Sequence, residues 1–208
     1  MAILAPHIPF YREVFDVPDL LADPFLMLGY QQILGHGEAE DFDFPDVVEL
    51  LAARGVGEVT TLDLFDDRAD LRYDLNVPVP DNEHDRYATV FDIGTLEHVF
   101  DSRQCLESSL RMVRPGGHYF GHTPVKGYYR HGFHTFHPAF LRLALKENGF
   151  DILYLKYSSE GGEPLDRPEY GDDVLLWIVG RKTAPMGEFR IPQQPLWIDH
   201  YSPSTGPG

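Results

Sequence analysis

Histidines are the residues of this sequence with the clearest capacity for chemistry. Ten occur among 208 residues, and six of them fall between residues 98 and 137. These six are His98, His118, His122, His131, His134 and His137. An imidazole titrates near neutral pH, so it is a natural base for removing a proton from a hydroxyl group. We therefore expect one of them to act as general base in a reaction at a hydroxyl.

Metal binding is the second chemistry that such histidines could serve. His134 and His137 are three residues apart, but this spacing is common and no third ligand lies next to them in the sequence. A short acidic segment is typical of a solvated turn rather than a metal site, and it contains Asp66, Asp67 and Asp70. The sequence predicts no metal site, and a metal held by the histidines is the alternative.

Strand and helix patterns alternate along most of the chain. Apolar runs predict strands at 25–28, 59–63, 71–75, 88–93, 118–122, 151–157 and 174–181. Helical patterns begin at Pro45 and cover 102–113 and 138–148. Such alternation predicts a mainly parallel sheet, because each crossover needs a helix. Only a loop separates the last two strands, so we predict an α/β fold with one Rossmann-like, doubly wound mixed sheet of about seven strands, the last one antiparallel.

The ends of the predicted strands are where a ligand would bind, because open parallel sheets hold ligands outside their carboxyl ends. Small and polar residues follow these strands, and they are Gly29, Tyr30, Asp63, Asp74, Gly94, Thr95 and Thr123. We expect them to form a ring around one cleft.

Both ends of the chain are rich in proline. Residues 1–23 contain Pro6, Pro9 and Pro18 among aromatic residues, which predicts an irregular or short-helical cap. The tail, residues 183–208, has five prolines but also Phe189, Trp197 and Tyr201. We predict one domain over 1–182, followed by a tail that is either a loose terminus or an arm packed on the body, on a second subunit or on the cleft.

Composition limits the class of protein. The formal net charge of −16 argues against a nucleic-acid partner, because binding to phosphate backbones depends on clustered Lys and Arg. Cys105 is the single cysteine, and no apolar run approaches the roughly 20 residues that span a bilayer. The first residues lack the basic start of a signal peptide. We expect a cytoplasmic protein that does not bind membranes.

Three segments resemble the class I S-adenosylmethionine-dependent methyltransferases. Residues 91–99, FDIGTLEHV, look like that family's fourth strand and the turn after it. Residues 110–117, LRMVRPGG, look like its helix and turn before strand five. Residues 134–141, HTFHPAFL, followed by Asn148-Gly149-Phe150, are similar to its His-containing loop and strand-six entry. The resemblance covers roughly residues 24–182 and implies S-adenosyl-L-methionine as cofactor.

The resemblance also implies roles for individual residues. Asp63 would accept hydrogen bonds from both ribose hydroxyls of the cofactor, and Asp74 and Leu75 would contact the adenine. The implied cofactor-binding set is Gly29, Tyr30, Asp63, Leu64, Asp74, Leu75, Gly94, Thr95 and His98. His134 occupies the loop position over the family's active cleft and is the implied base, with His122 and Glu97 as further catalytic candidates.

The segment after the first strand of the predicted sheet departs from the family pattern. Family members usually carry a glycine-rich turn there, whereas residues 27–35 read MLGYQQILG and keep only Gly29 plainly. Because glycine lets backbone approach a ligand closely, Tyr30, Gln31 and Gln32 must alter this loop. A non-catalytic or regulatory relative is therefore an alternative. A nicotinamide-dependent oxidoreductase is a weaker one, since the close-spaced glycine fingerprint is missing.

The acceptor is the least determined part of the prediction. Tyr128, Tyr129, Trp197 and Tyr201 offer flat faces of the kind that stack on sugars. The sequence favours an O-methyltransferase that acts on a small hydroxylated substrate, with a saccharide such as a mannoside as first choice. A homodimer is an open alternative to a monomer.

Overall fold

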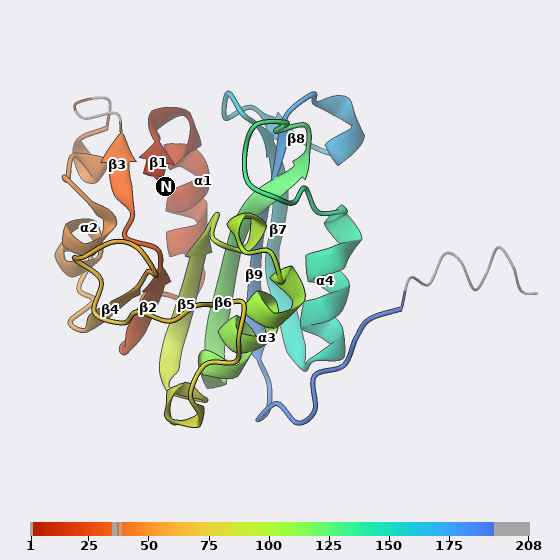
Figure 1. Cartoon of the computed structure of the whole chain (residues 1–208). Coiled ribbons are helices and arrows are strands. Elements are labelled where there is room, and N and C mark those ends of the chain that lie inside the picture. The colour runs from red at the N-terminus through yellow and green to blue at the C-terminus, as the bar shows by residue number, and fades with distance from the viewer. Residues whose placement is uncertain (1, 35–36, 38, 194–208) are drawn as a thin grey trace, which may run out of the picture.

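A mixed sheet of seven strands forms the centre of the molecule, in the order β4-β2-β5-β6-β9-β7-β8 (Figure 1). The computed structural model describes residues 2–34, 37 and 39–193. The strands of this sheet are β2 (Phe25–Leu28), β4 (Val59–Leu62), β5 (Tyr87–Ile93), β6 (Val113–Lys126), β7 (Phe150–Ser159), β8 (Pro164–Leu165) and β9 (Val174–Lys182). A separate two-stranded parallel sheet pairs β1 (Ala2–Leu4) with β3 (Gln32–Leu34).

The directions of the strands confirm the predicted topology. Strands β4, β2, β5 and β6 run parallel, whereas β9 is antiparallel to both of its neighbours, β6 and β7. Every residue of β2 and β5 is buried. The apolar run of β2 and the mostly apolar sequence of β5 fit strands that are covered on both faces.

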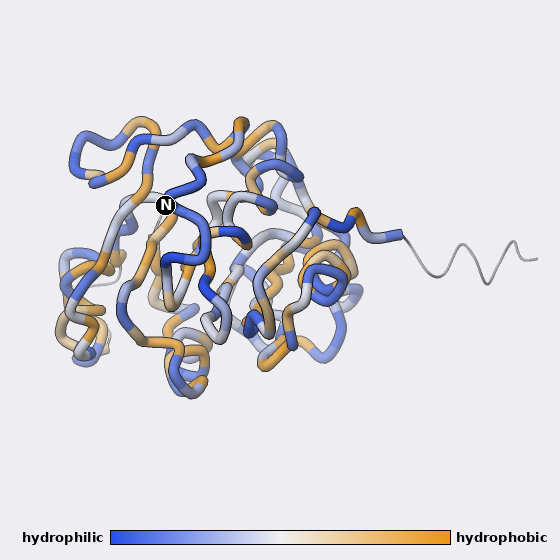
Figure 2. Tube along the Cα trace, turned by 90° about the horizontal axis from the view of Figure 1, so that it is seen from below, coloured by the Kyte–Doolittle hydropathy of each residue, from blue (hydrophilic) through white to orange (hydrophobic). Residues whose placement is uncertain are grey.

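Helices cover the two faces of the sheet (Figure 1). The α-helices are α1 (Ile8–Phe15), α2 (Val47–Ala53), α3 (Ser102–Met112) and α4 (Pro138–Glu147), and the 3-10 helices are Ala5–His7, Glu40–Phe42, Asp81–Glu83, Leu96–His98 and Pro168–Tyr170. Apolar residues of α1 and α2 belong to one core, and those of α3 and α4 belong to another. The helices carry both hydrophobic and hydrophilic residues (Figure 2), as expected where only one side of a helix is buried.

The third predicted strand, 71–75, is wrong. Only an isolated bridge joins Leu71 to Leu62, and the segment between β4 and β5 crosses the front of the sheet as a loop (Figure 1). The carboxylate of Asp70 accepts hydrogen bonds from the amide and hydroxyl of Thr61, at 2.9 and 2.8 Å, which fixes this loop against β4 through a side chain. The seventh strand of the sheet is instead β8, which the sequence did not predict.

Two element boundaries also differ from the predictions. The first predicted helix begins at Val47 rather than Pro45, because the side chain of Asp46 caps it by accepting from the amide of Glu49 at 3.0 Å. Strand β6 is far longer than 118–122 and includes the Pro-Gly-Gly turn as an irregularity. A Cβ on Gly117 would lie 2.6 Å from the carbonyl oxygen of Ala88, so glycine allows this close approach.

The ends of the described chain pack on the body. Residues 2–23 form the short elements β1 and α1, in agreement with the predicted cap. In the tail, Phe189 is buried, and the amide of Arg190 donates to the Asn148 side chain at 2.8 Å. Trp197 and Tyr201 lie outside the described residues.

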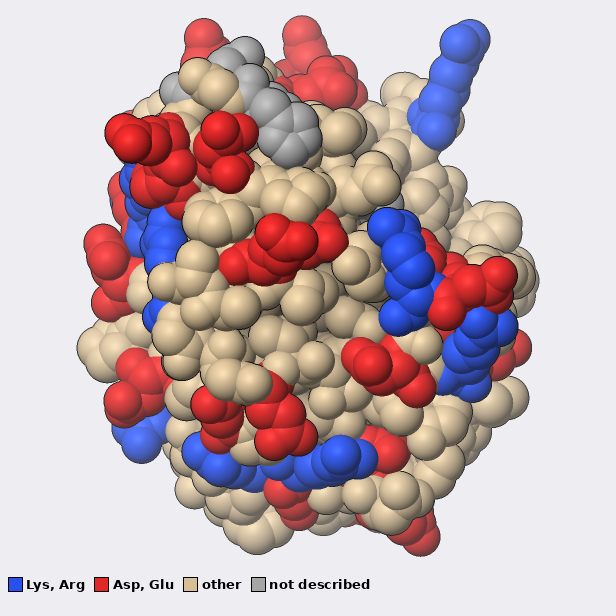
Figure 3. Space-filling model, turned by 90° about the vertical axis from the view of Figure 1, so that its left-hand side faces the viewer, with Lys and Arg blue, Asp and Glu red and all other residues tan. Residues whose placement is uncertain are grey.

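Surface charge is distributed rather than concentrated on the face shown in Figure 3, where basic side chains lie beside several groups of acidic ones. Ion pairs on the described surface include Arg12 with Asp41 and Arg68 with Asp66, at 2.5 and 2.6 Å. None of the described helices combines the length and the apolar character that crossing a membrane requires.

Candidate functional site

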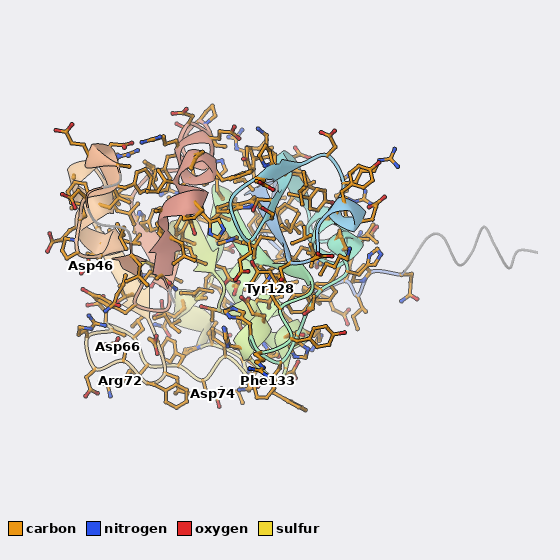
Figure 4. The ribbon with its side chains drawn as sticks, turned by 90° about the horizontal axis from the view of Figure 1, so that it is seen from above. Asp46, Asp66, Arg72, Asp74, Tyr128 and Phe133 are labelled. Carbon is orange, nitrogen blue, oxygen red and sulfur yellow. The ribbon has the colours of Figure 1, made fainter. Side chains whose placement is uncertain are left out.

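A cleft of about 550 Å³ opens at the carboxyl ends of β2, β4 and β5, and we call it the strand-end cleft. Seven of the nine predicted cofactor residues line it, namely Gly29, Asp63, Leu64, Asp74, Leu75, Thr95 and His98. Tyr30 is not among its lining residues, and Gly94 lines a neighbouring hollow instead. Figure 4 shows Asp74 close to Phe133, which reaches the same cleft from the loop between β6 and α4.

Asp63 follows β4, and one of its two carboxylate oxygens accepts hydrogen bonds from the turn that Asp63 begins. Its Oδ1 accepts from the amides of Phe65 and Asp66, at 2.9 and 3.1 Å. Its Oδ2 has only a longer contact, 3.3 Å, with the amide of Tyr30. Because a carboxylate oxygen can accept more than one hydrogen bond, Oδ2 keeps capacity for a ligand hydroxyl.

The loop after β2 is held by side chains rather than by a run of glycines. Gly29 has a φ of 77°. The buried side chain of Gln31 donates from Nε2 to the carbonyls of Leu28 and Ile93, at 2.9 and 3.4 Å, and so joins the ends of β2 and β5. The hydroxyl of Tyr30 donates to Asp46 at 2.7 Å, which directs this ring toward the start of α2.

The turn after β5 is organised by a buried carboxyl group. Asp92 accepts from the amide of Thr95 at 2.8 Å and from the hydroxyl of Tyr119 at 3.0 Å. Burial, reinforced by the nearby Glu97, raises the pKa of Asp92 to about 7. The hydroxyl oxygen of Thr95 is buried and has no hydrogen-bond partner among the described residues. Since Thr95 lines the strand-end cleft, a ligand there could supply that partner.

A second, smaller cavity of about 180 Å³ lies on the other side of this turn, and we call it the histidine hollow. Its polar lining residues are His7, Glu97, His122 and His131. Two of the three predicted catalytic residues, Glu97 and His122, therefore line the histidine hollow.

His122 projects from β6 into the histidine hollow and is fixed on one side. Its Nδ1 is 3.1 Å from the hydroxyl of Tyr11, and its ring stacks on Trp177 with centroids 3.9 Å apart. Its Nε2 is buried without a partner among the described residues. Burial, with smaller effects of His7 and His131, lowers the pKa of His122 well below its usual value. The ring is therefore neutral at pH 7. Its Nε2 can accept a proton in the tautomer in which Nδ1 carries the ring proton and donates to the hydroxyl oxygen of Tyr11.

Glu97 connects the hollow with the loop that follows β6. Its side chain is 1% exposed, and its Oε2 accepts from the hydroxyl of Thr123 at 3.0 Å. Its Oε1 lies 3.4 Å from Nε2 of His131. The contact with Glu97 raises the pKa of His131 above its usual value.

The predicted base His134 lies apart from these two cavities. It lines a separate hollow formed by its own loop, residues 127–135. Its Nε2 donates to the carbonyl of Phe100 at 3.0 Å, so this nitrogen carries a proton and cannot accept one. His134 therefore lies outside both cavities, whereas His122, the second candidate for the base, lies in the histidine hollow.

Comparison with known proteins identifies the fold. Neither a protein-family model nor a curated protein sequence matches the chain. An S-adenosylmethionine-dependent methyltransferase from Mesorhizobium loti is similar in structure, with a TM-score of 0.57 and 18% identity over 86% of this chain and 98% of that one. The chain has the class I methyltransferase fold.

Other solved structures agree with the methyltransferase fold. A SAM-dependent methyltransferase from Archaeoglobus fulgidus matches with a TM-score of 0.50 and 15% identity, over 84% of this chain and 93% of that one. The CMeT domain of the citrinin polyketide synthase matches with a TM-score of 0.51 and 13% identity, over 85% of this chain and 51% of that one.

Sequence reasoning missed several residues of the two cavities. His7 enters the hollow from the N-terminal cap, and Phe100 and Phe133 line the cleft. Gln31 was noted only as a departure from the family pattern, although its buried amide organises the loop. No motif or spacing marked His7, because it lies in the N-terminal cap, far in the sequence from the other polar residues that line the hollow.

Proposed function

We propose that this chain is an S-adenosyl-L-methionine-dependent O-methyltransferase that acts on a small hydroxylated acceptor. One observation carries the proposal: the strand-end cleft gathers seven predicted cofactor residues, and the histidine hollow, with an unpartnered imidazole nitrogen, lies directly across the turn at 94–97. Two adjoining cavities of this kind can hold a methyl donor and a hydroxyl acceptor. The methyltransferase fold supports the same reading.

The residues of the cleft fit the cofactor. Oδ2 of Asp63 has capacity to accept from ribose hydroxyls, and the carboxylate of Asp74 faces the same cavity. Leu64, Leu75 and Phe100 supply apolar surface for an adenine ring. The buried hydroxyl of Thr95 lies where the cleft approaches the hollow and would gain a hydrogen bond from the cofactor.

His122 is the residue we assign as general base. When bound, S-adenosyl-L-methionine supplies an electrophilic methyl group on sulfur. The bond between sulfur and that methyl carbon would break, with its electron pair going to sulfur, as the acceptor oxygen bonds to the carbon. Nε2 of His122 would accept the proton that the acceptor hydroxyl loses. The bond between Nδ1 and Tyr11 holds the ring in place, and orientation of the oxygen toward the methyl carbon supplies much of the rate.

A saccharide remains our first choice of acceptor. The histidine hollow presents polar groups suited to several hydroxyls, and the flat face of Tyr129, which is fully exposed, lies on the adjacent loop. Tyr128 is anchored on the same loop by its amide, which donates to Asp173 at 2.7 Å. We further propose a cytoplasmic protein without nucleic-acid or membrane partners, with a homodimer as an open alternative.

One observation favours a second candidate, a non-catalytic or regulatory protein of the same fold. The Gln31 side chain is buried between the ends of β2 and β5, beside the loop that usually approaches the cofactor through glycines. If the side chain closes that part of the site, the cofactor does not bind.

Isothermal titration calorimetry with S-adenosylhomocysteine separates the two candidates. Binding to the wild-type chain is expected, and Asp63→Asn should weaken it by about tenfold to a hundredfold, because a charge-assisted hydrogen bond contributes about 1.5–3 kcal/mol. Asp67→Asn is the matched control, since that side chain is 90% exposed in the same segment. No detectable heat at about 1 mM ligand would overturn the enzyme proposal.

A further inference from the structure

Three potential metal ligands converge at the junction of the strand-end cleft and the histidine hollow. Glu97 and His98 are consecutive residues of the turn after β5, and His131 comes from the loop between β6 and α4. One donor atom from each residue lies within 4.8 Å of the other two. The rings of His98 and His131 meet edge to face, with centroids 4.8 Å apart.

The backbone holds His131 beside Glu97. The amides of Phe133 and His134 both donate to the carbonyl of Glu97, at 2.7 and 3.1 Å. Gly132, which follows His131, has a φ of 67°, and a Cβ on it would lie 2.7 Å from the carbonyl oxygen of Glu97. The loop can therefore pack this closely only because residue 132 is glycine.

Among the residues that the structure describes, no lysine or arginine pairs with the carboxylate of Glu97. It is 1% exposed, and among the described residues its one ion-pair partner is His131, which is charged only when protonated. The hydrogen bond that Glu97 accepts from Thr123 uses Oε2 and leaves Oε1 facing His131. A buried carboxylate is costly unless it is paired or coordinates a metal. A cation bound between Oε1 and the two imidazoles would supply that pairing.

We infer that Glu97, His98 and His131 form a binding site for one divalent transition-metal ion, with Zn²⁺ as the first choice. Two imidazoles and one carboxylate suit Zn²⁺, Mn²⁺, Fe²⁺ or Co²⁺, whereas Mg²⁺ and Ca²⁺ prefer oxygen ligands. Three protein ligands leave at least one coordination position open, as in catalytic rather than structural zinc sites.

The location of the proposed ion would allow the acceptor hydroxyl to bind at its open coordination position. His98 lines the strand-end cleft, while Glu97 and His131 line the histidine hollow, so the ion lies where the two cavities meet. A hydroxyl oxygen bound there would lose its proton more readily, because a metal ion lowers the pKa of an oxygen that it coordinates. The ion would thus orient the acceptor and help His122 to remove its proton. This use rests on the proposed function, whereas metal binding itself does not.

The test uses untagged full-length protein that has been treated with a chelator and contains no cofactor. Calorimetric titration with Zn²⁺ should give one ion per chain, and Co²⁺ should give the visible absorption of a site with imidazole ligands. Glu97→Gln and His131→Gln should each weaken Zn²⁺ binding by about 100-fold or more, the upper end of the effect seen even for outer-shell residues. His134→Gln is the matched control, because it lies in the same loop outside the cluster.

Three outcomes would overturn the inference. One is no stoichiometric binding of Zn²⁺ or Co²⁺ by the wild-type chain. Another is equal Zn²⁺ affinity in the Glu97, His131 and His134 variants. The third is binding of Mg²⁺ or Ca²⁺ alone. If Glu97→Gln fails to fold, His98→Gln serves in its place, since His98 is exposed and its loss should also weaken Zn²⁺ binding. The affinity for S-adenosylhomocysteine is measured separately, so failure of the metal site and failure of the proposed function remain distinguishable.

Discussion

Replacement of Tyr11 by phenylalanine isolates the hydrogen bond that fixes His122. Tyr11 is 0% exposed, and its hydroxyl lies 3.1 Å from Nδ1 of His122 in a buried setting. Phenylalanine keeps the ring, so no large cavity forms, but Nδ1 is left buried without its partner. A buried polar group without a partner costs about 1–3 kcal/mol. For a domain of about 200 residues, a loss of about 2 kcal/mol corresponds to a fall in Tm of about 4–8 °C.

Thermal and urea unfolding followed by circular dichroism measure this loss. The matched control is Tyr73→Phe, because Tyr73 is only partly buried and its hydroxyl lies 3.4 Å from Glu83, so the change in free energy of unfolding should stay within about 0.5 kcal/mol. Equal stability of the two variants would refute the reasoning about His122. Nitrogen-15 spectra of the histidine side chains provide a second measurement, since the tautomer of His122 should change only in Tyr11→Phe.

Two further predictions concern His122 itself. His122→Gln should lower turnover by about 10²- to 10⁴-fold while leaving the affinity for S-adenosylhomocysteine nearly unchanged. Steady-state kinetics should show no comparable loss of turnover for His134→Gln. A larger loss in His134→Gln than in His122→Gln would return the role of base to His134. Burial lowers the pKa of His122 in the folded chain. Below about pH 6.5 this histidine is therefore protonated in the unfolded chain while it stays neutral in the folded chain. The free energy of unfolding should therefore fall between pH 7 and pH 5, and more steeply in wild type than in His122→Gln, by up to about 1.4 kcal/mol per pH unit; parallel curves in urea titrations would contradict this.

The buried parallel strands and the residues at their ends could be predicted from the sequence because these features depend on local patterns. Strands β2 and β5 are buried and mostly apolar, and they end on glycine-containing turns, at Gly29 and Gly94. Parallel strands place those turns at one edge of the sheet. The gathering of Asp63 and Thr95 in one cleft follows from that rule alone.

The predicted third strand failed for an equally physical reason. Residues 71–75 alternate apolar and polar side chains, which is the pattern of a strand with one exposed face. The segment is held instead by the side chain of Asp70 on Thr61 and by a single bridge at Leu71. A side chain that bonds to a neighbouring strand can replace a backbone ladder, and no periodicity reports it.

The grouping of Glu97 with His131 could not be predicted from sequence spacing. The two residues belong to different loops, and their contact depends on the positive φ and the missing side chain of Gly132. The same packing directs His134 toward Phe100 and away from the cavities. The resemblance pointed to the loop that contains Phe133, which lines the cleft, but it could not indicate which of the loop's histidines contacts Glu97.

The turn formed by residues 94–97 borders both cavities, since Thr95 lines the strand-end cleft while Gly94 and Glu97 line the histidine hollow. Neither cavity can be reshaped through this turn without disturbing the other. Substitutions here that adapt the chain to a new acceptor should therefore also change its cofactor affinity. If bound cofactor changes the affinity for the acceptor by some factor through this turn, bound acceptor must change the affinity for the cofactor by the same factor. In the loop at 127–135, by contrast, His131 lines the hollow and Phe133 lines the cleft, so separate substitutions there can change one cavity at a time.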